Sequence, residues 1–163
     1  MLIEASKELD VEIKIAGVGD LMEELKLLVS HYQLEKKVAF LGNLSPEVLS
    51  KVTADAWIGY NLLENVGLSY YYSLSNKTFD YMQAGIPQLI PDFPEYNQLN
   101  AQYHFGLTLT LTTAAIVNAV KRLQSDNLLY KKLQSGALVA STFCQWKNEE
   151  TTLLAVIGKN TIQ

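Results

Sequence analysis

The chain has 163 residues, of which 48% are hydrophobic and 18% charged, a composition that fits one soluble globular domain with a full core. Its formal net charge of -4 and its pI near 5.2 leave no basic excess for binding nucleic acid through phosphates. The lone Cys144 excludes an internal disulfide and predicts a buried, unreactive thiol. No stretch approaches the roughly 20 apolar residues of a membrane-spanning helix, so we expect no membrane span.

Short apolar runs alternate with longer stretches of helical period, which is typical of βαβ units around a buried parallel sheet. We expect helices at 1–9, 20–34, 46–54, 75–84, about 95–102, 113–124, 126–140 and 146–158. Strands are expected at 11–17, 37–42, 56–62, 86–91 and 106–111. The predicted fold is therefore a three-layer α/β/α Rossmann-like domain with a parallel sheet of about five strands, and residues 1–163 form that single domain.

The two ends of the sequence are unusual for this fold. Residues 1–9 are predicted to form a helix with no strand before it, whereas a doubly wound domain normally starts with a strand. We therefore expect that part of the fold lies upstream of this sequence. At the other end, several apolar side chains are placed to cover a surface of the domain: Phe143, Trp146, Leu153, Leu154 and Ile157.

The first candidate for ligand contact is the turn "IAGVGD", which follows the strand expected at 11–17. Gly17 and Gly19 indicate that backbone atoms, and not side chains, face whatever lies against this turn. The turn lacks the third glycine of the dinucleotide-binding fingerprint, so it does not by itself identify a nucleotide.

The second candidate is "SLSNKTFDYMQAGIP", where a predicted helix begins after a long polar and aromatic loop. Ser75 is suited to cap this helix, which leaves the N–H groups of Asn76, Lys77 and Thr78 free for an anion, with the helix dipole behind them. Lys77 adds a full positive charge. The alternative interpretation is an ordinary capped helix on which Lys77 and Asp80 form an exposed ion pair.

Asp80 supports the ligand interpretation, because aspartate is a mediocre residue for a helix interior and lies too far along to benefit from the N-terminal dipole. A carboxylate one turn beyond a phosphate site is placed to accept hydrogen bonds from two neighbouring ribose hydroxyls. Phosphate and ribose together indicate a nucleotide.

The segments "IAGVGD", "VAFLGNLSPEVL", "ADAWIGYNLLEN" and "YYYSLSNKTFDYMQAGIPQLIPDFPE", taken in order, resemble the carboxy-terminal, donor-binding half of retaining GT-B glycosyltransferases of the group 1 (family 4) kind. The resemblance covers nearly the whole chain. It implies a domain that binds a nucleoside-diphosphate sugar, while an acceptor domain absent from this sequence would hold the acceptor glycan or lipid-linked glycan.

The resemblance implies a role for each matching position. Asp80 stands where the second glutamate of the family's Glu-x7-Glu motif binds the ribose, although it is one methylene shorter. Asn76 and Lys77 stand where backbone amides hold the diphosphate. Leu44 stands where the chain lies against the base, and the glycines of "IAGVGD" correspond to a turn bordering the cleft.

Tyr72 departs from the family pattern. Many members have the first glutamate of the motif there, contacting hydroxyls of the donor sugar, so we expect altered sugar contacts. Because neighbours in an extended segment face opposite sides, Tyr70, Tyr71 and Tyr72 cannot all enter one core. We expect Tyr72 to be exposed at the mouth of the cleft, in a loop that exposes tyrosine and leucine.

The resemblance further implies a retaining hexosyltransferase that works in the cytoplasm or at the inner membrane face, with no cofactor and no metal. No residue of this chain is a convincing catalyst, so we expect the chain alone to be inactive. Two other classes are considered. A sugar-nucleotide epimerase half shares the architecture, whereas a flavodoxin-like signalling domain would need clustered acidic residues at the first strand ends, which this sequence lacks.

Overall fold

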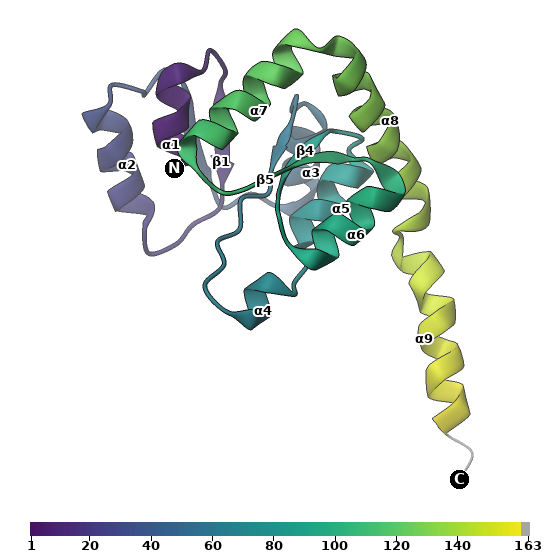
Figure 1. Cartoon of the computed structure of the whole chain (residues 1–163). Helices are drawn as coiled ribbons and strands as arrows, with labels where there is room; N and C mark the ends of the chain where they lie inside the picture. Colours follow the sequence, from purple (N-terminus) through teal and green to yellow (C-terminus); the bar gives the residue numbers. More distant parts are fainter. Residues whose placement is uncertain (161–163) are drawn as a thin grey trace.

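The computed structural model describes residues 1–160 and contains five strands, all parallel to their neighbours (Figure 1). Each strand lies inside a predicted range. The strands are β1 Ile13–Ala16, β2 Val38–Gly42, β3 Gly59–Tyr60, β4 Gln88–Pro91 and β5 Gly106–Leu109. The fold is thus the predicted mixed α/β class.

The strands form two sheets, which differs from the single sheet that we expected. β1 pairs with β2 in one sheet, and β3, β4 and β5 pair in that order in the other. β3 is also much shorter than the predicted 56–62, and within residues 1–160 it pairs with β4 alone.

The helices follow the predicted order, with one addition in the long loop before α5. Their bounds are α1 Leu2–Ala5, α2 Met22–His31, α3 Pro46–Ala54, α4 Leu68–Tyr71, α5 Asn76–Gln83, α6 Pro94–Tyr103, α7 Thr113–Ser125, α8 Asn127–Phe143 and α9 Trp146–Asn160. A 3₁₀ turn, η1 Ser6–Glu8, extends α1. No helix within residues 1–160 combines the length and the apolar character needed to cross a membrane.

The three-stranded sheet lies between two layers of helices. Leu89 of β4 packs with a cluster that includes residues of α1 and α7, whereas the next residue, Ile90, packs with residues of α5, α6 and α8. Successive residues of a strand point to opposite faces, so both faces of β4 are covered. Both side chains are fully buried, and each such burial stabilises the fold by about 1.5–3 kcal/mol.

The two-stranded sheet is covered more completely on one face than on the other. Ile13 and Val38 are buried against Ile3 of α1 and Val29 of α2. On α3, by contrast, no side chain is buried. The sheet formed by β1 and β2 therefore packs well on α1 and α2 but lacks a tight layer under α3.

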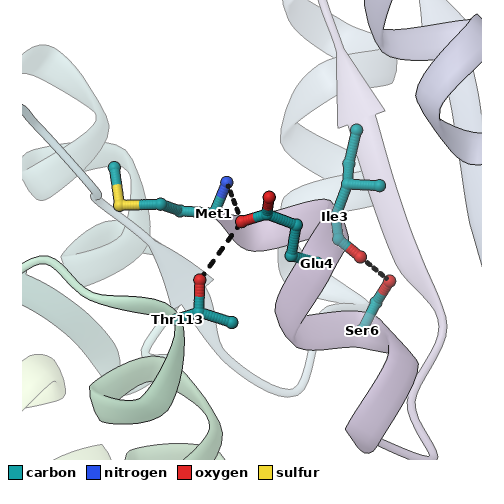
Figure 2. Close-up of polar contacts among 5 residues, drawn as sticks. All are labelled: Met1, Ile3, Glu4, Ser6 and Thr113. Carbon is teal, nitrogen blue, oxygen red and sulfur yellow. Dashed lines mark hydrogen bonds and ion pairs between the residues drawn. The ribbon is translucent and has the colours of Figure 1, made fainter.

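The start of α1 is fixed to the start of α7 (Figure 2). The Thr113 hydroxyl donates to the Glu4 carboxylate at 3.2 Å, and the amino terminus of Met1 pairs with the same carboxylate at 3.1 Å. Chiefly because of the amino terminus, the pKa of Glu4 lies below its ordinary value. Since Thr113 follows β5, Met1 lies at the carboxyl edge of the sheets, and Figure 1 shows it near the end of β1.

The expected packing of the C-terminal apolar side chains holds for Phe143 at the end of α8, whose ring stacks on that of Tyr103 with centroids 5.9 Å apart. It is wrong for the side chains on α9, which are exposed because α9 runs away from the domain (Figure 1): Trp146, Leu153, Leu154 and Ile157. Cys144 lies between α8 and α9 and is half-buried. Burial, together with the negative charge of Glu149, raises the pKa of its thiol, which agrees with the predicted unreactive cysteine.

Candidate functional site

The helix α5 begins where we predicted an anion site, but its cap differs from the prediction. The Ser75 side chain makes no capping hydrogen bond; its hydroxyl instead donates to Oδ1 of Asn61 at 2.9 Å. Its backbone N–H donates to the hydroxyl of Tyr96 at 3.0 Å. The predicted side-chain cap by Ser75 is therefore wrong, because the buried amide of Asn61 is a competing partner for the same hydroxyl.

A buried polar network positions the first turn of α5. Nδ2 of Asn61 donates to the Thr78 hydroxyl at 2.7 Å, and Nε2 of Gln88 donates to the Thr78 carbonyl at 2.8 Å. All three side chains are buried. Because Asn61 follows β3 and Gln88 begins β4, the network holds α5 against the ends of two strands.

We did not predict this network, although the sequence contains a signal for it. Asn61 lies in the run predicted as a strand at 56–62, and Gln88 lies in the apolar run "IPQLIP". Buried polar side chains are almost always hydrogen-bonded, so an amide in a predicted core strand indicates a specific partner. The sequence does not say that this partner is the start of α5.

The network leaves two backbone N–H groups at the start of α5 open to solvent. The Thr78 N–H donates to the Ser75 carbonyl at 3.0 Å, whereas those of Asn76 and Lys77 have no acceptor in the part of the chain that the structure describes. Lys77 and Asp80 are exposed and form no ion pair with each other, which disfavours the exposed-pair interpretation. These amides, the dipole and the Lys77 ammonium form a site suited to an anion.

Lys77 and Asp80 also line a cavity of about 540 Å³ that extends from α5 to β1. Ala16 at the end of β1 and Tyr60 of β3 contribute to its wall, as does Tyr81 of α5. Asp80 further lines a smaller cavity of about 260 Å³ between α3 and α5. Asp80 therefore lines both cavities.

Two tyrosines in the cavity wall remain protonated over a wide pH range. Burial raises the pKa of Tyr60 to about 12, and burial followed by the negative charge of Asp80 raises that of Tyr81. The Tyr60 backbone partly opposes this rise in the pKa of Tyr81. The Tyr81 ring occupies the space that a Cβ at Gly59 would need.

Other predicted site residues lie outside the cavity lining. Gly17 has a φ of +134°, which favours glycine, and its N–H donates to the Gly42 carbonyl at 2.7 Å. Leu44 follows two residues later, so Gly17 and Leu44 lie near the same edge of the two-stranded sheet. Gly19, between Gly17 and α2, is exposed.

Tyr72 is 59% exposed, as predicted, and contacts the edge of Tyr71, with ring centroids 5.0 Å apart. The reason that we gave was wrong, because this segment forms the short helix α4 and not an extended strand. Tyr71 packs on Phe93 at 5.4 Å. The loop also exposes Leu68, so the predicted exposure of apolar side chains in this loop is confirmed. Tyr72, however, does not line either cavity.

The sequence matches no family model and no curated protein. Solved structures, by contrast, share its fold. Sucrose-phosphate synthase from Thermosynechococcus elongatus has a TM-score of 0.80 at 16% identity, covering 98% of this chain and 41% of that enzyme. The pneumococcal O-GlcNAc transferase GtfA in complex with UDP and GlcNAc has a TM-score of 0.76 at 16% identity, covering 99% and 32%.

Anabaena HepE in complex with UDP-glucose has a TM-score of 0.72 at 16% identity and covers 86% of this chain and 39% of that protein. The chain therefore has the fold of one half of a GT-B glycosyltransferase, and it fits the carboxy-terminal half that the sequence resembles. It spans only about two fifths, or less, of the length of these structures.

Proposed function

We propose that this domain binds the nucleoside diphosphate of a sugar nucleotide, as the donor-side half of a retaining hexosyltransferase. The observation that carries the proposal is the start of α5, where two backbone N–H groups and the Lys77 ammonium, none of them with a partner among residues 1–160, stand one turn before the Asp80 carboxylate. A diphosphate fits the N–H groups and the ammonium, and ribose hydroxyls fit the carboxylate.

The structural neighbours support this assignment. GtfA was solved with UDP and GlcNAc, and HepE with UDP-glucose, so proteins with this fold hold this class of ligand. We propose Gly17, Gly19 and Leu44 as the boundary of the nucleotide pocket and Tyr72 as a sugar-side contact. Ser75 acts indirectly, because it holds the start of α5 through Asn61.

Sugar transfer requires more than this domain provides. A departing nucleoside diphosphate is stabilised by preorganised cations and amides in a closed cleft. Here Lys77 is the single cation placed among the proposed ligands within residues 1–160. We therefore propose that the acceptor, glycan or lipid-linked glycan, is held by a second domain, that no metal is needed, and that this chain alone transfers no sugar.

The diphosphate contact is tested with Lys77→Gln. Charge-assisted hydrogen bonds contribute about 1.5–3 kcal/mol, so we expect the variant to weaken UDP binding by about tenfold or more in titration calorimetry. Lys36→Gln is the matched control: Lys36 is exposed and lies before β2, at the opposite end of the strands, so its affinity should stay within about twofold of the parent. Failure of the folded parent to bind UDP or GDP at millimolar concentration would overturn the proposal.

The ribose contact is tested with Asp80→Asn and a dideoxy ligand. The parent should bind UDP several-fold more tightly than its 2′,3′-dideoxy analogue, because the analogue lacks both hydroxyls that Asp80 would bind. In Asp80→Asn this difference should shrink to about twofold or less. Asp10→Asn, an exposed aspartate before β1, should keep the parental preference. An unchanged preference in Asp80→Asn would remove Asp80 from the ribose site.

A further inference from the structure

The corner between α7 and α8 gathers positive charge in a chain whose net charge is -4. Lys121 and Arg122 lie near the end of α7, and Lys131 and Lys132 lie near the start of α8. All four are exposed, and none forms an ion pair with a carboxylate of residues 1–160. Their charge is therefore available to a partner of opposite charge.

The acidic side chains near this corner lie elsewhere than its outer side. Asp126 is the only acidic residue between 113 and 143, and its Oδ1 accepts from the Leu129 N–H at 2.8 Å as the cap of α8. Glu12 and Asp55 line the larger cavity together with Gln124, so they lie on the side of α7 that faces the sheet. The cations on the outer side remain uncompensated within α7 and α8.

Exposed apolar side chains share the outer face of α8 with its lysines. The side toward the core is defined by the buried residues Leu133, Gly136, Ala137 and Ala140. At 100° per residue, Leu128, Leu138 and Val139 fall on the other side, and they are 84%, 53% and 51% exposed. Lys131 falls between them in angle, and Lys132 falls at the angle of Val139. These five side chains make the outer face of α8 both apolar and positive.

A bilayer that contains anionic lipids matches both properties. Its negative surface potential attracts lysine and arginine, and the boundary between its headgroups and acyl chains accepts exposed leucine and valine. Lysine can keep its methylene stem in that boundary while its ammonium reaches the phosphates. A nucleic acid is bound chiefly through its phosphates, which would leave the exposed leucines without a role.

We propose that the outer face of α8, together with the end of α7, is a docking surface for a bilayer of anionic lipids. α8 has 17 residues and extends about 25 Å, so it can lie along the bilayer surface. In Figure 1 the corner lies at the end of the domain opposite to α4, the helix in the loop before α5. Docking there leaves the start of α5 uncovered, and the inference does not depend on nucleotide binding.

The test is sedimentation of the full chain with large unilamellar vesicles. One set contains about one third phosphatidylglycerol in phosphatidylcholine, and the other contains phosphatidylcholine alone. We expect the partition coefficient to be at least tenfold higher for the anionic vesicles and to fall steeply as salt is added. Equal partition into both sets would overturn the proposal.

A pair of double variants locates the surface. Lys131→Gln with Lys132→Gln should lower the partition coefficient for anionic vesicles about tenfold or more, since each lysine near such a surface contributes about fivefold. Lys36→Gln with Lys51→Gln removes the same charge from exposed residues outside α7 and α8 and should lower it no more than about threefold. All four positions tolerate a polar side chain, so both proteins should fold. Equal losses in the two double variants would contradict a localised surface.

Leu128→Ser tests the apolar contribution and should lower the partition coefficient about threefold or more. Binding that this variant leaves intact would overturn the proposal, because a purely electrostatic surface would suit a nucleic acid or an acidic protein equally well. Leu153→Ser with Leu154→Ser, on the exposed α9, is expected to keep the parental partition coefficient. A loss confined to that variant would assign the docking to α9 and also overturn the proposal.

Discussion

Gly136→Ala is expected to destabilise the domain by about 2–4 kcal/mol, although alanine is the better helix former. Gly136 is buried in α8, and a Cβ there would overlap the backbone carbonyl oxygens of Tyr103 and His104 at the end of α6. Backbone atoms cannot rotate away as a side chain can, so α6 and α8 would have to separate. Urea denaturation monitored by circular dichroism measures the loss.

The matched control is Gly158→Ala in α9, where an added Cβ meets no atom within 4 Å. At this position only the higher helix propensity of alanine acts. We therefore expect the free energy of unfolding to stay the same or to rise by up to about 1 kcal/mol. Because α9 extends away from the domain, the gain should concern the helix and not the core (Figure 1). Equal effects of the two substitutions would contradict the proposed close approach of α6 and α8.

The order and type of the elements could be predicted because each apolar run is short and each helical stretch has a clear start or stop. α3 covers the expected range 46–54, and Ser45 caps it, since the Val48 N–H donates to the Ser45 hydroxyl at 3.4 Å. α4 was missed because it is a single turn within a loop, where four residues carry no periodicity. These predictions needed only local sequence.

The arrangement of the elements depended on contacts that local sequence does not contain. The break in the sheet arises because a strand ladder requires a neighbour, and no pattern within 11–17 or 56–62 states whether one is present. The orientation of α9 likewise depends on what its apolar side chains can pack against. The capping prediction for Ser75 failed for a related reason, since its competing partner, Asn61, is distant in sequence.

Asn61 connects the fold to the proposed function, and Asn61→Ala is expected to affect both. The substitution removes the acceptor of the Ser75 hydroxyl and the amide that donates to the Thr78 hydroxyl, at 2.9 and 2.7 Å. A buried polar group without a partner costs about 1–3 kcal/mol, so we expect a stability loss of about 2–4 kcal/mol in urea denaturation.

The same substitution should weaken UDP binding about fivefold or more. This loss should appear without urea, where the protein stays folded. Without Asn61, the first turn of α5 is no longer held in place, so the N–H groups of Asn76 and Lys77 lose the preorganisation that an anion site requires. Asn65→Ala, in the exposed loop after β3, should change stability by less than about 0.5 kcal/mol and leave UDP binding intact. A stable Asn61→Ala protein with parental UDP affinity would show that the network positions neither the helix nor its ligand, whereas a destabilised protein with parental affinity would confine the role of Asn61 to the fold.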